Sequence, residues 1–291
     1  MTHHSEIRRV TLRDGRTLAW AEYGDPAGQP VLYFHGFPGS RLEPLMPGEA
    51  QAWARVRLIV PDRPGFGHST FQPGRRLLDW PDDVTELADS LGLDRFACMG
   101  VSGGGPYAIA CAFRLPGRLT RTAVVCGIGP VDTPEGTRGM MLPNRLLFTL
   151  SRYSQTVGRL AIASMSRLLR RDPQAALARL RRFLPEPDRA VLDRPELLEW
   201  FVMSNLEAVR QGTRAAGQES QLFARPWGFR LADVAAEIDL YQGEQDVNVA
   251  PAMGHHQARA LGSCKAHFFP DEGHLSLVIN RMDEILQRLV S

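Results

Sequence analysis

Lysine is almost absent from this chain, and neither sign of charge is in excess. Lys265 is the only lysine, so arginine supplies nearly all of the positive charge, which we attribute to coding bias. The 34 basic residues face 32 acidic ones and give a formal net charge of +2. A chain this close to neutrality lacks the field that draws proteins to nucleic acid or to a membrane surface, so we expect neither partner.

Cysteines are few, and their spacing is not that of metal ligands or of a redox pair. The chain has four, with no Cys-x-x-Cys motif: Cys98, Cys111, Cys126 and Cys264. Three of them lie in apolar segments, where a thiol usually behaves as a small core side chain. This pattern predicts a reduced, cytoplasmic protein with no metal site.

Long hydrophobic runs are missing as well. Residues 1–10 are polar and do not contain the apolar stretch of a signal peptide. The longest uncharged run, residues 96–113, contains a glycine cluster and Pro106, which fit a buried strand and helix better than a membrane span. With 44% hydrophobic and 23% charged residues, the chain has the composition of a globular protein.

Short apolar segments recur along the chain, with helical patterns between them. Residues 8–13 and 17–22 predict a hairpin around Asp14-Gly15, and amphipathic patterns predict helices at residues 80–91 and 278–289. Strands alternating with helices predict an α/β fold: a mostly parallel, twisted sheet of about eight strands, flanked by helices. The remaining predicted strands cover residues 31–34, 56–60, 96–101, 123–128, 238–241 and 266–269.

The alternation stops between about residues 132 and 225. This stretch is rich in leucine, methionine and arginine, is interrupted by prolines and has no strand-like segment. An all-helical insertion in an alternating core is typical of a cap over a site. We therefore expect an α/β core in residues 1–133, a helical cap in residues 134–226 and the second part of the core in residues 227–291.

The pentapeptide Gly100-Val101-Ser102-Gly103-Gly104 lies between an apolar strand-like segment and a helix-like one. A Gly-x-Ser-x-Gly pattern in a strand–turn–helix setting predicts a nucleophilic serine on a sharp, strained turn. Gly100 and Gly104 leave room where strand and helix approach each other. We therefore predict that Ser102 is a nucleophile.

A serine hydroxyl needs a base to take its proton and an acid to orient that base. Two downstream loops supply these groups: one after residues 238–241 carries Asp246, and one after residues 266–269 carries His274. Both loops follow predicted parallel strands, whose carboxyl ends share one edge of a sheet. Asp246 is the predicted acid and His274 the predicted base, with Glu244 and Asp132 open as alternative acids.

Five motifs, in this order, resemble those of the α/β-hydrolase superfamily, in particular serine hydrolases of the esterase type with a helical cap. The resemblance covers roughly residues 31–132 and 238–290. The motifs are His35-Gly36-Phe37-Pro38-Gly39, Asp62 to Ser69, the serine turn, Gly243 to Asp246, and Gly273-His274.

The resemblance implies an oxyanion hole made of two backbone N–H groups. One would come from Gly103, next to the nucleophile, and the other from the loop after the third strand. Pro38 has no N–H, so Phe37 is the better donor in that loop. His35 and Gly36 are expected to order the loop rather than to take part in catalysis.

The remaining histidines and the arginines have plainer interpretations. We expect His68 to be structural or to line the rim of the site, and His3-His4 and His255-His256 to be solvated pairs rather than metal ligands. A basic stretch in the predicted cap is interpreted as a solvated helix face: Arg167, Arg170, Arg171, Arg179, Arg181 and Arg182. A subset of the apolar cap residues should roof the site and favour an apolar acyl or alcohol group.

Differences from the motifs of related enzyme families reduce the number of reactions to consider. Haloalkane dehalogenases and epoxide hydrolases carry an aspartate nucleophile, where this chain has Ser102. Proline iminopeptidases usually carry Trp after the serine, and carbon–carbon bond hydrolases often have Asn before it and Met after it; this chain has Val101 and Gly103. The resemblance thus implies a carboxylesterase-like serine hydrolase that acts on a small ester or related acyl substrate through a Ser-His-Asp triad and a covalent acyl-enzyme, without a cofactor.

Other functions on the same scaffold stay open. They are a carbon–carbon bond hydrolase, an aminopeptidase, cofactor-free chemistry on a heteroaromatic or peroxide-forming substrate, and a ligand-binding receptor with little turnover. Fold analogy does not separate these activities. The sequence also leaves the oligomeric state open.

Overall fold

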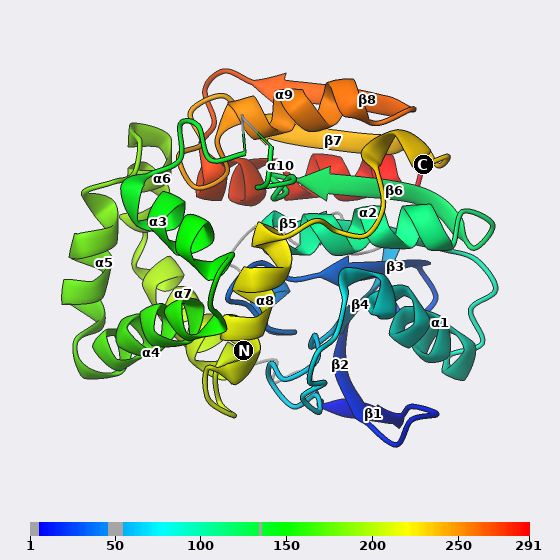
Figure 1. The fold of residues 1–291 in the computed structure, drawn as a ribbon. Coiled ribbons are helices and arrows are strands. Elements are labelled where there is room, and N and C mark those ends of the chain that lie inside the picture. Colours follow the sequence, from blue (N-terminus) through cyan, green and yellow to red (C-terminus); the bar gives the residue numbers. More distant parts are fainter. Residues whose placement is uncertain (1–5, 46–54, 134–135) are drawn as a thin grey trace.

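The computed structural model describes residues 6–45, 55–133 and 136–291; the predicted pair His3-His4 lies outside them. Eight strands form one sheet in the order β1-β2-β4-β3-β5-β6-β7-β8 (Figure 1). The pairs β1–β2 and β2–β4 are antiparallel and the other neighbours are parallel, as predicted. The strands are β1 (Arg8–Thr11), β2 (Thr17–Gly24), β3 (Gln29–Phe34), β4 (Val56–Pro61), β5 (Phe96–Val101), β6 (Leu119–Val125), β7 (Ile238–Gly243) and β8 (Cys264–Phe269).

Two local predictions have different outcomes. The predicted N-terminal hairpin is present, because β1 and β2 pair in register from Arg8–Trp20 to Thr11–Thr17. The predicted strand at residues 123–128 is displaced toward the N-terminus and ends at Val125. Cys126 has φ 47°, in the left-handed region, so an extended strand does not continue through it.

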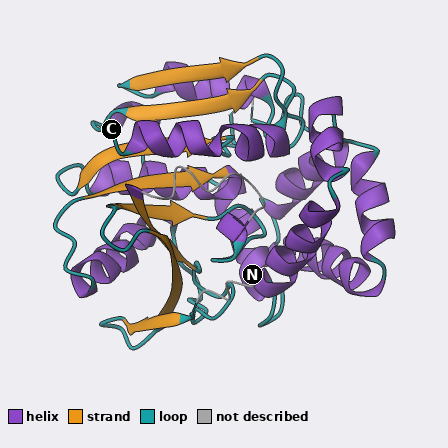
Figure 2. Ribbon diagram, turned by 180° about the vertical axis from the view of Figure 1, so that it is seen from behind, coloured by secondary structure: helices purple, strands orange, loops and turns teal. Residues whose placement is uncertain are grey.

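Alternating side chains of the strands form two apolar layers, one on each face of the sheet. Leu32 and Phe34 pack on the face covered by α1 (Trp80–Ser90), α2 (Gly105–Arg114) and α9 (Pro251–Ala260). Val31 and Tyr33 pack on the opposite face, against α10 (His274–Leu289). Accordingly, α10 lies behind the sheet in Figure 1 and in front of it in Figure 2. Short 3-10 turns are η1 (Glu43–Leu45), η3 (Leu77–Asp79), η4 (Ser102–Gly104) and η5 (Leu231–Asp233).

Six helices separate β6 from β7, and we call α3–α8 the helical insertion. They gather at the edge of the sheet toward which the parallel strands point (Figure 2). Several of the prolines that interrupt the sequence sit in the first turn of a helix, where the missing N–H costs nothing. The helices are α3 (Leu142–Ser151), α4 (Gln155–Arg171), α5 (Pro173–Arg181), α6 (Glu186–Leu192), α7 (Pro195–Ala208) and α8 (Arg214–Ala224). None of the described helices has both the length and the apolar character that crossing a bilayer requires.

Candidate active site

Ser102 lies on a sharp turn between β5 and α2, and its φ of 52° is in the left-handed region. Such a conformation costs a residue with a side chain about 1–3 kcal/mol. A Cβ on Gly100 would collide with the backbone of Gly104, and a Cβ on Gly104 would collide with the carbonyl of Phe34. The glycines therefore allow strand and helix to close while the serine stays at the carboxyl end of β5.

The structure brings Ser102, His274 and Asp246 together from three separate segments that follow β5, β8 and β7. His274 Nε2 lies 3.0 Å from Ser102 Oγ, and His274 Nδ1 lies 2.7 Å from Asp246 Oδ2. Asp246 is almost fully buried, and its Oδ1 accepts hydrogen bonds from the backbone N–H groups of Asn248 (2.7 Å) and Val249 (2.9 Å). With Nδ1–H donating to the carboxylate, Nε2 is free to accept the serine proton.

His274 differs from its prediction in one respect: it is the first residue of α10 rather than a loop residue. The loop after β8 ends at Gly273. The imidazole is thus fixed to the end of a helix of 16 residues that packs along the sheet.

The two alternative acids lie elsewhere. Asp132 is exposed and lines a surface cavity beside Trp227 and Arg259. Glu244 is exposed and pairs with His255, with 3.2 Å between Oε1 and Nε2. Of the three candidate acids, Asp246 is the one that contacts His274.

Three carboxylates set the electrostatics around the imidazole. Burial lowers the pKa of His274, but Asp246, then Asp188 and Glu43, outweigh burial and raise that pKa above its ordinary value. The neighbouring charges therefore favour the imidazolium that forms when a serine loses its proton to this ring.

The loop that carries Phe37 lies against the serine turn. A Cβ placed on Gly103 would lie 3.0 Å from the Phe37 nitrogen, so the two segments are in close contact. Among the described residues, no hydrogen-bond acceptor engages the Phe37 N–H. Phe37 and Ser102 line the same cavity.

The loop that carries Phe37 is held by buried polar groups. His35 is fully buried; its Nδ1 lies 2.9 Å from the Gly36 carbonyl, and its Nε2 accepts from the Arg63 N–H at 3.2 Å. Burial, followed by Arg63, holds the pKa of His35 well below its usual range, so this ring is neutral. The Gly36 N–H donates to Glu43 Oε2 at 2.8 Å. His35 and Gly36 thus order the loop, and neither contacts Ser102 through a hydrogen bond of the described residues.

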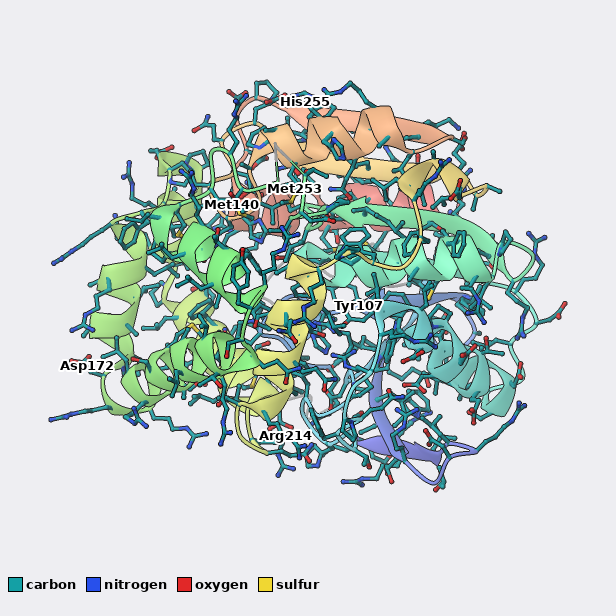
Figure 3. The ribbon with its side chains drawn as sticks, in the orientation of Figure 1. Tyr107, Met140, Asp172, Arg214, Met253 and His255 are labelled. Carbon is teal, nitrogen blue, oxygen red and sulfur yellow. The ribbon has the colours of Figure 1, made fainter. Side chains whose placement is uncertain are left out.

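A buried charge network joins this loop to the helical insertion. The Arg63 guanidinium donates to the carbonyls of His35 and Gly36 and, through Nε at 2.8 Å, to Glu219 on α8. Tyr107, on α2 beside α8 in Figure 3, donates to Glu219 at 2.6 Å. Burial raises the pKa of Glu219, but Arg63 and Arg75 outweigh it and lower that pKa to about 2. Glu219 is therefore a charged residue of the insertion held in the core.

A cavity of about 240 Å³ extends from Ser102 and His274 into the insertion. Phe37, Glu43 and Val101 line its sheet end. Most of the remaining lining consists of apolar side chains between β6 and β7, including Phe148, Ile162, Met165, Leu180, Leu184 and Phe201. Met141 and Trp200 also line the cavity, whereas Leu142, Leu146 and Met203 are exposed to solvent.

In the described part of the chain, one cluster of His, Cys and carboxylate side chains is compact enough to share a metal ion: Cys126, Asp246 and His274. Burial, followed by Asp246, holds the pKa of the Cys126 thiol well above its usual range, so a thiolate is not available. The thiol instead lies 3.7 Å from the His274 carbonyl, to which it donates. The cluster is better suited to hydrogen bonding than to metal coordination.

The other histidines and arginines are engaged away from the serine. His68 lies 3.2 Å from Glu207 of α7 and 2.8 Å from an Arg210 nitrogen, so it joins the core to the insertion. His255 stacks on Phe268 at 4.0 Å between ring centroids. The arginines of the basic stretch on α4 and α5, and Arg182, which follows α5, are all exposed.

Three buried carboxylates near the site have no recognisable signal in the sequence: Glu43, Asp188 and Glu219. Each lies in a segment that reads as polar surface, and Asp188 and Glu219 belong to helices that pair with distant parts of the chain. One sequence signal is that Glu219 lies four residues from both Ala215 and Phe223, which places it on the same helix face as these two apolar residues.

Comparison with known proteins gives one family. The model of the family described as "alpha/beta hydrolase fold" matches residues 29–280. Lipase 1 of Psychrobacter immobilis is 30% identical over 151 residues, covering 50% of this chain and 47% of the lipase. A 2-hydroxy-6-oxo-2,4-heptadienoate hydrolase of Pseudomonas putida is 31% identical over 133 residues, covering 43% of this chain and 46% of that protein. The chain spans about half the length of the curated relatives it matches.

The solved structures agree on the fold. A thermophilic esterase from Thermogutta terrifontis superimposes with a TM-score of 0.67 over 99% of this chain and 100% of the esterase, at 24% identity. Identity this low supports the fold alone. With the family match over residues 29–280, the eight-stranded sheet and the serine turn after β5, the chain belongs to the alpha/beta hydrolase fold family.

Proposed function

We propose that this protein is a serine hydrolase that cleaves carboxylic esters with an apolar acyl or alcohol group. The observation that carries the proposal is the hydrogen-bonded series from Ser102 Oγ through His274 to Asp246 Oδ2, at one end of an apolar cavity. The lipase and the esterase among the similar proteins support the same reaction class.

In the proposed mechanism, His274 Nε2 takes the proton of Ser102 as Oγ attacks the acyl carbon. Asp246 orients the ring and stabilises the imidazolium. The Phe37 and Gly103 N–H groups bind the oxygen that becomes negative. His274 then protonates the leaving alcohol, and a water molecule repeats the sequence on the acyl-enzyme to release the acid and restore Ser102. Every proton moves between Ser102, His274, the alcohol and water, so the reaction needs no cofactor.

The helical insertion acts in this proposal as the cap, with boundaries at residues 134–226. Phe148, Ile162 and Met165 line the cavity and supply the apolar surface for the substrate. Each methylene that enters such a surface contributes about 0.8 kcal/mol, or roughly a fourfold gain in kcat/KM. We therefore expect medium-chain esters to be better substrates than acetates until the cavity is full.

We also propose a cytoplasmic location. The four cysteines are free thiols, and three of them are buried. Free thiols are the ordinary state of cysteine in a reducing compartment.

A panel of p-nitrophenyl esters from acetate to decanoate tests the function. We expect multiple turnovers per protein molecule, with the highest kcat/KM at a medium chain length, and loss of turnover in Ser102→Ala. The matched control is Ser90→Ala, at the exposed end of α1, which should behave as the wild type.

Three outcomes would contradict the proposal. Saturable binding of esters without turnover would indicate a receptor. Turnover of amino-acid amides or of carbon–carbon bonds in preference to esters would assign one of the other hydrolase reactions. Full ester turnover by Ser102→Ala would show that Ser102 is not the nucleophile.

A further inference from the structure

Asp188, on helix α6 of the insertion, is fully buried against the start of α10. Its Oδ2 accepts a hydrogen bond from the His274 N–H at 3.0 Å. Its Oδ1 accepts from the N–H groups of Leu275 at 2.9 Å and Ser276 at 3.0 Å. One carboxylate from the insertion thus binds three successive backbone donors, and the first of them belongs to the candidate catalytic base.

These contacts provide hydrogen-bond acceptors for the first N–H groups of α10. The first N–H groups of a helix have no partner within the helix, and a side chain just before it usually supplies one. The residue before α10 is Gly273, which has no side chain. A Cβ on Gly273 would collide with the Asp188 carboxylate. The glycine therefore makes the space that Asp188 fills, and the cap of α10 comes from 86 residues away in the sequence.

The contacts of Asp188 offset part of the cost of burying its charge. Burial raises the pKa of Asp188 above its ordinary value, and the backbone donor of Ser276 and the neighbouring His274 reduce that rise. The positive end of a helix dipole also favours a carboxylate at this position. The carboxylate accepts the hydrogen bonds from all three backbone N–H groups, which suits its ionised form.

His274 is consequently held at four atoms. Asp188 holds its backbone nitrogen, the Cys126 thiol contacts its backbone carbonyl, Asp246 holds Nδ1, and Ser102 meets Nε2. Three of these groups come from the α/β core. Asp188 alone comes from the helical insertion.

We propose that Asp188 is a positioning residue that couples the seating of the helical insertion to the placement of His274. When α6 is seated, the carboxylate fixes the first turn of α10 and holds Nε2 within reach of Ser102 Oγ. When α6 moves away, the His274 N–H loses its acceptor and the ring loses one of its constraints. This proposal rests on the serine hydrolase function, because His274 must be the base for its placement to affect turnover.

The test compares Asp188→Asn with Asp193→Asn. Asn keeps the shape of Asp but presents one acceptor oxygen and an NH₂ group, so it does not satisfy all three backbone donors. Asp193 follows α6 and is exposed, with its carboxylate paired to Arg181, so its substitution is a matched control. We expect Asp188→Asn to lower kcat on the best ester on the order of tenfold, the equivalent of losing one charge-assisted hydrogen bond, with little change in KM. Asp193→Asn should behave as the wild type.

A second readout separates positioning from a general loss of stability. The groups that face His274 are Asp246 after β7, Glu43 after β3, the neutral Cys126 thiol after β6 and Asp188 on α6. Removing the Asp188 charge should lower the pKa of His274. Since the neutral ring is the base, the acid limb of the kcat/KM profile should then move to lower pH. An NMR titration of labelled histidine, with the His274 signal assigned by its loss in His274→Gln, measures the same pKa without any substrate.

The outcomes are distinct. A lower kcat together with a lower His274 pKa in Asp188→Asn, and neither change in Asp193→Asn, supports the proposal. An unchanged His274 pKa, or equal losses of kcat in the two variants, overturns it. If the wild type fails to turn over any ester, the proposed function is wrong, and the NMR titration still decides whether Asp188 acts on His274. If Asp188→Asn does not fold, Asp188→Glu replaces it, because Glu keeps the charge but displaces the acceptors. The His274 pKa should then stay near its wild-type value while kcat falls; a wild-type kcat in Asp188→Glu contradicts the proposal.

Discussion

The two ends of the cavity come from different parts of the fold and are built on different principles. At the sheet end, Ser102, Asp246 and His274 follow strands of the parallel sheet, and each is fixed by backbone geometry or by hydrogen bonds. At the insertion end, the lining is mostly apolar and comes largely from α3, α4, α5 and α7, with Asn144, Ser204 and Asn205 as polar members. Under the proposed function, the sheet end determines which atoms react, whereas the insertion end determines which substrates fit.

Two buried carboxylates of the insertion contact the sheet end. Asp188 binds the backbone of His274, and Glu219 binds Arg63, which in turn binds the carbonyls of the Phe37 loop. Through these buried carboxylates, the insertion is therefore attached both to His274 and to the loop that carries Phe37. Changes at the sheet end should lower turnover of every ester, and changes at the insertion end should alter the preference among esters.

The largest effect should come from the sheet end, in Asp246→Asn. The amide no longer holds Nδ1–H as a carboxylate does, and it stabilises the imidazolium less, so kcat should fall roughly 10⁴-fold for all esters. Steady-state rates on the best ester measure the loss. The control is Asp239→Asn, on β7, where the carboxylate lies near His267 and not near His274. This variant should keep nearly full activity. Activity near normal in Asp246→Asn would assign the orienting role to another group.

A smaller loss is expected in Gly103→Ala. The added Cβ would lie 2.5 Å from the Phe37 Cβ and 3.0 Å from the Phe37 nitrogen, so the loop must shift and the N–H moves off the oxyanion. Losing one such donor costs on the order of a hundredfold in kcat. Gly117→Ala is the control, because its Cβ would meet no atom within 4 Å. A wild-type kcat in Gly103→Ala would show that the Phe37 N–H is not an oxyanion donor.

The smallest effect on turnover should come from the insertion end, in Met165→Trp. The larger side chain fills part of the cavity, so kcat/KM should drop roughly fourfold for each methylene group excluded, while acetate turnover stays nearly constant. Leu160→Trp, on the exposed face of the same helix, should leave the profile unchanged. The ester panel measures both. Equal losses for short and long esters would contradict the division between the two ends.

More of the structure of the sheet end than of the insertion can be predicted from the sequence. The central strands, such as β5, are predictable because they are short, apolar and buried on both faces. Ser102 is predictable because glycines must flank so tight a turn. The carboxyl ends of β7 and β8 bring Asp246 and His274 together by topology alone. These features depend on local residue types and on the alternation of strands and helices, and both can be recognised in the sequence.

The residues that the sequence does not reveal depend on distant pairing. Asp188 reads as an exposed acid in a polar helix, yet it caps α10 because Gly273 leaves the space open. Glu219 reads as part of a polar segment, yet two arginines of the core surround it. Local patterns do not encode which helix will lie beside which turn. The amphipathic pattern predicts the last helix only from residue 278, whereas α10 starts at His274. The reason is the same, because the cap of α10 comes from the insertion.

The most direct test of the central claim is to locate the adduct of a fluorophosphonate probe by peptide mass spectrometry. The probe forms a bond between its phosphorus and an activated serine oxygen, with loss of fluoride, and needs no knowledge of the natural substrate. We predict a single stoichiometric adduct on Ser102, formed quickly by the wild type and slowly by Asp246→Asn. An adduct on another residue, or no adduct on Ser102 in the folded wild type, would contradict the account.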